Sequence, residues 1–217
     1  MCAAAKCAIV DAVRIRAIAF DVGGVLEWVE SPDLALTAKW RVRLGMGEPE
    51  FRSAVARVDP DDLVTTGHLS EAEYRQRYAD ALGLSPAQAD EFMADLWDWY
   101  CGELDAELVA YAAALRPQFG TAILSNSADG ARREEEARYS FSELVDTIIY
   151  SDEVGLAKPD PRIFELTCRT LRVAPDELIF LDDVPENVAA ACRFGIHGIA
   201  HRSTPESIAA IDALIGR

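Results

Sequence analysis

The sequence lacks two features that would tie the protein to a membrane or to nucleic acid. No apolar stretch approaches the roughly 20 residues that a membrane-spanning helix requires, so we expect no membrane partner. Positive charge is also scarce, because 21 Lys and Arg stand against 37 Asp and Glu, for a net charge of −16. Nucleic-acid binding requires a basic surface, so this acidic chain predicts no nucleic-acid partner.

Cysteine and histidine are scarce as well. The five cysteines are an odd number without a CxxC pair, which favours free thiols in the cytoplasm over a disulfide framework. The three histidines match no metal-binding or triad spacing. Residues 1–16 are superficially similar to a signal peptide, but Lys6 and Asp11 interrupt their apolar stretches. We therefore expect a short N-terminal extension and a cytoplasmic protein.

The length of 217 residues suits one sizeable domain, or a core domain with a smaller one inserted. From about residue 105, short apolar runs alternate with helix-like segments, which predicts a doubly wound, largely parallel α/β sheet. Residues 33–103 instead show helical signals, including capping boxes that begin at Ser70 and Ser85, and predict a helical insertion. The strands are expected at 15–20, 121–124, 147–150, 178–181 and 197–200, and a helix is expected over 129–144.

The first predicted strand ends on a carboxylate. The apolar run at 15–20 leads to Asp21, and Gly23 and Gly24 follow at once. Two glycines permit a tight turn and a close approach of main-chain amides to a ligand. Open α/β sheets bind ligands at the carboxyl ends of their strands. Asp21 is thus a candidate catalytic residue, although Asp at a strand end also forms ordinary turns.

Three later stretches extend this pattern. The run TAILSN ends on Ser125 and Asn126, and LIFLDDVPEN delivers the pair Asp182 and Asp183. A Pro-rich turn, GLAKPDP, places Lys158 just before a helix. In this order, the four stretches resemble the haloacid dehalogenase-like (HAD) hydrolase superfamily, and they span most of the chain.

The resemblance implies a Rossmann-like core interrupted by a helical cap that closes over the active site. We place the core at 1–28 and 105–217 and the cap at 29–104. The implied activity is that of a Mg²⁺-dependent hydrolase of the phosphatase type, acting on a small phosphorylated substrate. Monomer and homodimer both remain open as oligomeric states.

The resemblance also assigns roles to the acidic residues. Asp21 matches the family's nucleophile, which forms an aspartyl-phosphate. Because carboxylate and phosphate repel each other, the site requires positive charge, and Mg²⁺ is the usual solution. Its expected ligands are Asp21, Asp183 and the main-chain carbonyl of Gly23, with Asp182 as a supporting group or an alternative ligand. Outside the family pattern, Asp182 and Asp183 would be interpreted as a solvated turn that caps a helix.

Three further residues are expected to bind the phosphate. Lys158 would neutralise phosphate charge and so serve both catalysis and substrate binding. Ser125 and Asn126 would bind phosphate oxygens through side-chain and main-chain donors. The ordinary alternatives are a solvated surface lysine and a polar turn.

One position departs from the family pattern. Phosphatases of this family usually carry a second Asp two residues after the nucleophile, where this chain has Gly23. Glycine keeps the carbonyl group but removes a side-chain acid and base worth about 10²–10⁴-fold in rate. Glu27 and Glu30 are the nearest replacements in the sequence.

This departure leaves two alternatives to a phosphatase. A metal-independent 2-haloacid dehalogenase also lacks the second Asp, and a catalytically weak phosphate-ligand binding or regulatory protein needs none. The pair Asp182 and Asp183 favours the metal-dependent branch, because paired carboxylates at a buried edge are costly without a cation.

The first half of the predicted cap contains a group of basic residues. An ordinary solvated helix face is favoured over a second anion site for them. Trp28 and Trp40 lie near the junction of cap and core, and we expect them to pack in the interior rather than line a pocket. The basic residues are Lys39, Arg41, Arg43, Arg52 and Arg57.

Overall fold

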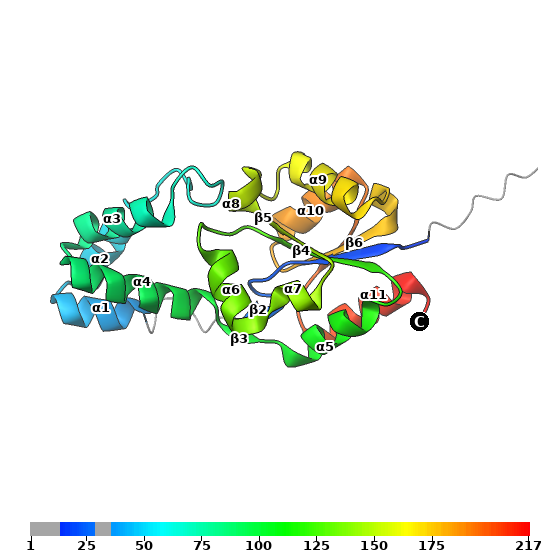
Figure 1. The fold of residues 1–217 in the computed structure, drawn as a ribbon, viewed down its shortest axis with the longest axis horizontal. Coiled ribbons are helices and arrows are strands. Elements are labelled where there is room, and N and C mark those ends of the chain that lie inside the picture. Colours follow the sequence, from blue (N-terminus) through cyan, green and yellow to red (C-terminus); the bar gives the residue numbers. More distant parts are fainter. Residues whose placement is uncertain (1–13, 29–35) are drawn as a thin grey trace, which may run out of the picture.

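The centre of the molecule is a five-stranded sheet in which every neighbouring pair of strands is parallel (Figure 1). The computed structural model describes residues 14–28 and 36–217. The strand order is β5-β4-β1-β6-β7, which confirms the predicted doubly wound α/β fold. The strands are β1 (Ala17–Phe20), β4 (Gly120–Ser125), β5 (Thr147–Tyr150), β6 (Leu178–Asp182) and β7 (His197–Ala200).

Helices cover both faces of this sheet (Figure 1). On one face Phe20 packs in a cluster with Leu108 and Ile211, and on the other Ala19 packs with Phe164. Strand β1 is therefore buried on both sides, as a continuous apolar run predicts. The first face is covered by α5 (Ala106–Leu115), α7 (Phe141–Leu144) and α11 (Thr204–Ile215), the second by α9 (Pro161–Leu171) and α10 (Pro185–Phe194).

The register of the central strands aligns their carboxyl ends. Phe20 at the end of β1 is paired with Ile123 of β4 and with Leu181 of β6. The polar residues that come after these positions therefore meet at one edge of the sheet.

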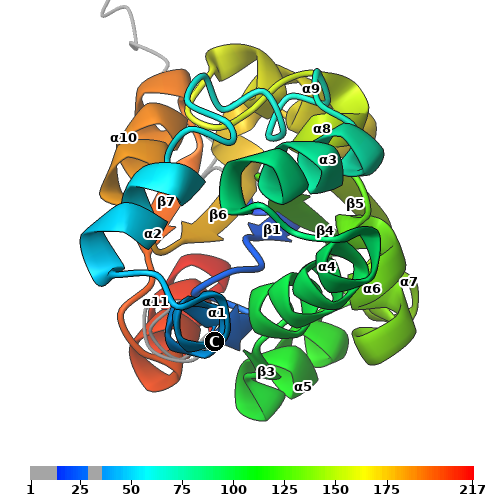
Figure 2. The same ribbon diagram turned by 90° about the vertical axis from the view of Figure 1, so that its left-hand side faces the viewer.

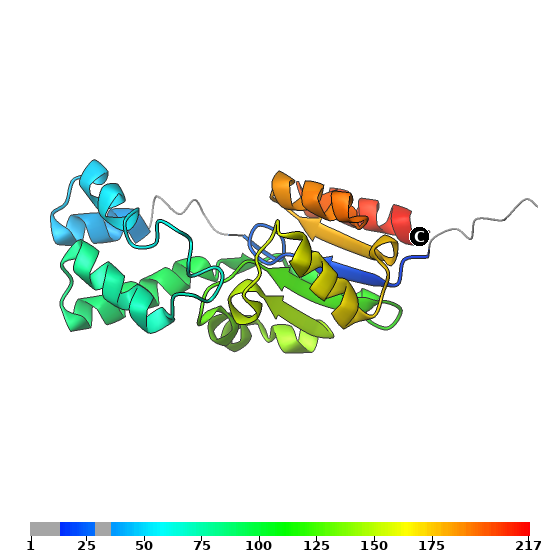
Figure 3. The ribbon, with the colours of Figure 1, turned by 90° about the horizontal axis from the view of Figure 1, so that it is seen from above.

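Four further helices pack around a hydrophobic cluster of their own, which includes Trp40 and Phe92 (Figure 2). Both predicted capping boxes are confirmed, since the Ser70 hydroxyl accepts from the Glu73 amide and Ser85 accepts from Gln88. These helices lie beyond the carboxyl ends of the strands (Figures 1 and 3). They are α1 (Leu36–Leu44), α2 (Glu48–Val55), α3 (Glu71–Leu82) and α4 (Pro86–Tyr100).

A two-stranded antiparallel ribbon joins these helices to the sheet. It is formed by β2 (Glu27–Trp28) and β3 (Glu103–Leu104). The ribbon coincides with the junctions expected at 28/29 and 104/105, but the division into core and cap stays a prediction. Residues 29–35, with Glu30, lie outside the described residues, as do residues 1–13.

Two local predictions are wrong. The helix expected over 129–144 is divided into α6 (Ala131–Tyr139) and α7, because Ser140 has a left-handed φ of 53°. Trp40 is buried as expected, whereas Trp28 is 49% exposed. Side chains alternate along a strand, and in β2 the inward position belongs to Glu27.

The remaining helical elements are short. No helix in the described ranges is long and apolar enough to cross a membrane. The short elements are α8 (Ser151–Val154) and the 3-10 turn η1 (Pro175–Glu177).

Candidate active site

The turn after β1 contains two glycines in different situations. Gly24 has a φ of +73°, and a Cβ there would collide with the Asp183 carboxylate, so only glycine fits. Gly23 lies outside the left-handed region, and a Cβ there would have no heavy atom within 4 Å. Position 23 therefore has room for a side chain, and its lack of one is not imposed by packing.

Lys158 is buried between two carboxylates. Its ammonium Nζ lies 2.7 Å from Asp21 Oδ1 and 2.8 Å from Asp182 Oδ2, and it donates to the Leu124 carbonyl at 3.0 Å. All three of its donors are thus used, and the side chain is 1% exposed. Buried charges persist only when paired in this way. The alternative of a solvated surface lysine is wrong.

The Asn126 side chain holds the main chain of Lys158. Its Nδ2 donates to the Lys158 carbonyl and its Oδ1 accepts from the Lys158 amide, both at 2.8 Å. Neighbouring Ser125 is buried at the end of β4, where its hydroxyl donates only a long bond of 3.4 Å to the Asn126 carbonyl. Asn126 thus positions the lysine loop, and Ser125 keeps a hydroxyl for a ligand.

The paired acids differ sharply in their surroundings. Asp182 is fully buried, and both of its oxygens accept bonds from Lys158, Asn187 or the Val184 amide. Asp183 is exposed by comparison. Because the Asp182 oxygens are occupied by protein donors, Asp183 is the better placed of the two to bind a cation.

Three carboxylates form a set suited to a divalent ion. One oxygen from each of Asp21, Asp182 and Asp183 lies within 4.8 Å of the others. Burial raises the pKa of Asp21, and the Lys158 ammonium opposes this rise. Burial and the Asp182 charge raise the pKa of Asp183. Clustered oxygen ligands with unfavourable mutual repulsion fit Mg²⁺, which prefers such donors.

One cavity of about 340 Å³ collects most of the predicted site. It is lined by Asp21, Gly23, Ser125, Asn126, Lys158 and Asp183, and also by Glu27, Trp99, Tyr100, Val184 and Asn187. Sequence reasoning missed the last four. Tyr100 belongs to residues 33–103, where the sequence showed only helical signals. Asn187 ends the stretch LIFLDDVPEN, from which only the two aspartates were chosen as candidates.

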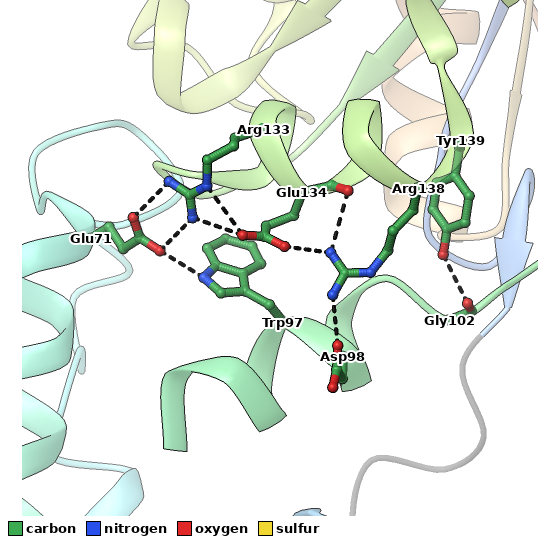
Figure 4. Close-up of polar contacts among 8 residues, drawn as sticks. All are labelled: Glu71, Trp97, Asp98, Gly102, Arg133, Glu134, Arg138 and Tyr139. Carbon is green, nitrogen blue, oxygen red and sulfur yellow. Dashed lines mark hydrogen bonds and ion pairs between the residues drawn. The ribbon is translucent and has the colours of Figure 1, made fainter. Parts of the chain in front are cut away.

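The two missed aromatic residues are carried by α4, and arginines of α6 bind α4 and the start of the neighbouring helix α3 (Figure 4). The Arg133 guanidinium donates to both Glu71 oxygens at 2.8 and 3.0 Å, and the Trp97 indole donates to the same carboxylate at 2.7 Å. Arg138 donates to Asp98 at 2.6 Å. These bonds fix the end of α4 next to the cavity.

The basic residues of α1 and α2 make partners within their own helical segment. Lys39 pairs with Asp95 at 2.7 Å and Arg41 with Glu48 at 3.7 Å. None of the five lines the cavity. The favoured prediction of an ordinary solvated helix face agrees with these contacts.

A second pair of acids is buried at the cavity, where Glu27 is a lining residue and Glu135 is its neighbour. Glu27 is 2% exposed, and burial together with Glu135 raises its pKa to about 8. Glu135 is fully buried in the otherwise polar helix α6, and burial raises its pKa to about 7. It accepts a hydrogen bond from the Tyr150 hydroxyl. Near pH 7 the Glu27 carboxyl therefore favours the protonated form, and the Glu135 carboxyl is divided between its two forms.

The raised pKa of Glu135 predicts a pH-dependent effect of Glu135→Gln on stability. A folded-state pKa above the unfolded value of 4.5 means that the stability contributed by this group is full below pH 4.5 and lost as pH rises toward 7. Glutamine cannot ionise, so the variant should gain about 1–3 kcal/mol relative to wild type between pH 5 and pH 8. Urea denaturation at both pH values measures the gain. Exposed Glu165→Gln is the control, and an equal effect at both pH values would contradict the expectation.

The family model for haloacid dehalogenase-like hydrolases matches residues 15–195. D-ribitol-5-phosphate phosphatase of Bacteroides thetaiotaomicron is 26% identical over 80% of this chain and 85% of its own length. Acyl-CoA dehydrogenase family member 10 of Mus musculus is 27% identical over 93% of this chain, but the match covers only 19% of that protein.

A solved structure shares the fold. The crystal structure of a HAD-family enzyme from Bacteroides thetaiotaomicron, in complex with magnesium and inorganic phosphate, has a TM-score of 0.72 at 20% identity. The match covers 88% of this chain and 96% of the other.

Proposed function

The chain belongs to the haloacid dehalogenase-like hydrolases, and from this membership we propose that it is a Mg²⁺-dependent phosphatase of small phosphate monoesters. The observation that carries the proposal is the placement of Lys158 between Asp21 and Asp182 at the wall of a cavity. A carboxylate paired with a buried cation, at the carboxyl end of a central strand, is a suitable nucleophile toward phosphorus.

Asp21 attacks the phosphorus atom and receives the phosphoryl group, and water then hydrolyses the aspartyl-phosphate. Lys158 orients the Asp21 carboxylate and balances negative charge within the cavity. Ser125 donates its hydroxyl to a phosphate oxygen, together with main-chain donors around Asn126. The aromatic residues Trp99 and Tyr100 exclude water from the reacting atoms.

Asp21, Asp183 and the Gly23 carbonyl would hold the metal, with Asp182 supporting Lys158. When bound, Mg²⁺ supplies positive charge to the phosphate oxygens and the carboxylates. Two observations support this assignment: the cluster of three carboxylates and the saturation of Asp182 by protein donors. The relative with magnesium and phosphate is consistent with it in fold.

The proposal also includes a domain division, a substrate class, an oligomeric state and a compartment. We place the core at 1–28 and 105–217, with 29–104 as the cap that carries Trp99 and Tyr100 to the cavity. A small phosphorylated molecule is the proposed partner, bound by a monomer or homodimer in the cytoplasm. Cys101, Cys168 and Cys192 are free thiols, which fits a reducing compartment.

Metal removal tests this function. Purified protein is assayed for phosphate release from aryl, alkyl and polyol phosphates in Mg²⁺ or in EDTA, and halide release from 2-haloacids is measured in parallel. EDTA should lower phosphate release about 10²–10³-fold, because the metal contributes several kcal/mol to charge stabilisation. Mg²⁺ at 100 times its Kd should also stabilise the folded protein by about 2.7 kcal/mol.

Two outcomes would contradict the proposal. Halide release that is unaffected by EDTA would identify the dehalogenase alternative. That alternative is considered because Gly23 stands where phosphatases of the family have a second Asp. Thermal stabilisation by inorganic phosphate without turnover of any ester would identify a binding protein.

A further inference from the structure

Unsatisfied polar atoms gather at the cavity. In the described ranges, three buried side-chain polar atoms lack a hydrogen-bond partner: Glu27 Oε2, Trp99 Nε1 and Glu135 Oε1. Glu27 and Trp99 line the cavity, and Glu135 is a close neighbour of Glu27. A buried polar atom without a partner costs about 1–3 kcal/mol. Such atoms at a cavity wall indicate that a bound molecule supplies the missing partner.

Glu27 is held rigidly beside the nucleophile. Its amide donates to the Val22 carbonyl at 3.0 Å, and its carbonyl accepts from the Gly24 amide at 2.7 Å. Pairing of Glu27 with Leu104 across the ribbon holds the residue from the other side. The main chain of Glu27 is thus fixed on the turn that leads out of Asp21, and its side chain takes the buried position of β2.

A phosphate ester of an ordinary alcohol needs a proton donor, because an alkoxide is a poor leaving group. The cavity offers few. Lys158 has all three donors in use, Asp21 is the proposed nucleophile and Asp183 a proposed metal ligand. Burial raises the pKa of the Tyr100 hydroxyl well above its usual range, and the Trp99 indole does not release its proton. Glu27 remains.

We propose that Glu27 is the residue that donates a proton to the leaving-group oxygen, an inference that rests on the proposed phosphatase function. Asp21 Oδ forms a bond to phosphorus as the bond from phosphorus to the ester oxygen breaks, and that oxygen takes the Glu27 proton. Water then attacks the phosphorus atom and passes a proton to the Glu27 carboxylate, and the bond to Asp21 breaks. The ester and water become alcohol and phosphate, and Glu27 ends protonated.

The cavity makes this donor suited to one substrate class. The Trp99 indole can donate to an oxygen, whereas Glu27 can give a proton to one. The ester oxygen of an alkyl or polyol phosphate can accept a hydrogen bond from Trp99, and it needs a proton when it leaves. A phenolate leaves without protonation, so aryl phosphates provide the matched comparison.

Leaving-group dependence in Glu27→Gln tests the proposal. We measure kcat/KM, which covers the steps up to alcohol release, for an alkyl and an aryl phosphate in Mg²⁺. The variant should lose about 10²–10⁴-fold with the alkyl ester and less than about tenfold with the aryl ester. Glu103→Gln, on the exposed side of the same ribbon, is the control and should change neither value.

Other results would overturn the proposal. An equal loss with both esters would assign Glu27 a structural role while leaving phosphatase function intact. Should Glu27→Gln fail to fold, the wild-type enzyme still decides: its kcat/KM should change little between aryl and alkyl esters, and a steep fall toward alkyl esters refutes internal proton donation. Absence of phosphate release from every ester by wild type would refute both the function and this inference.

Discussion

Asp21→Asn should abolish phosphate release, with a loss of at least about 10⁴-fold in kcat, because an amide cannot act as the nucleophile. The fold should survive the change. Asn has nearly the same shape, and Lys158 keeps its ion pair with Asp182 at 2.8 Å. Phosphate release in Mg²⁺ gives the activity, and thermal unfolding shows whether the variant is folded.

Asp176→Asn provides the matched control for this loss. Asp176 is exposed in the turn η1 that precedes β6, at the opposite end of that strand from Asp182. It should retain wild-type activity. If folded Asp21→Asn kept more than about a hundredth of the wild-type rate, another group would have to be the nucleophile.

Gly23→Asp should restore activity to the Glu27→Gln variant. The space at position 23 is open and its φ is not left-handed, so an Asp side chain can be added without collision. Its carboxyl would stand two residues from Asp21 and could give the leaving oxygen its proton. In the Glu27→Gln background we expect a gain of about 10²–10⁴-fold in kcat/KM for the alkyl phosphate.

The same substitution in the wild-type background separates the two carboxyls. With Glu27 present, proton donation is already provided, and Gly23→Asp should raise kcat/KM by less than about tenfold. Equal gains in both backgrounds would show that Glu27 supplies no proton, since independent residues contribute additively. The four variants thus form a double-mutant cycle read with one substrate.

Much of the site could be predicted from local sequence because strand ends are local. An apolar run followed by a polar residue fixes where Asp21 and Asp182 lie, whatever packs against the strand. A parallel sheet then brings those ends to one edge. Lys158 needed the family pattern in addition, because its burial depends on two partners far away in the chain.

The buried pair of Glu27 and Glu135 could not be predicted in this way. Glu135 lies in the run ARREEEARY, where nothing in the sequence marks one glutamate as buried. Its partner Tyr150 comes from β5, and only tertiary packing brings the two together. Glu27 was named for its proximity to Gly23, but its orientation depends on pairing with Leu104, about 77 residues away.

The ribbon of β2 and β3 has an evolutionary consequence. Because the chain leaves the sheet and returns to it on paired strands, the two ends of the helical segment are side by side. One such segment can be exchanged for another without rerouting the strand that leads to Asp21 or the loop that carries Lys158. Trp99 of α4 would be replaced together with the exchanged segment, whereas Glu27 would remain in the ribbon. Exchange of this segment during evolution would therefore change the residues that contact the substrate while the residues proposed for the reaction stay the same.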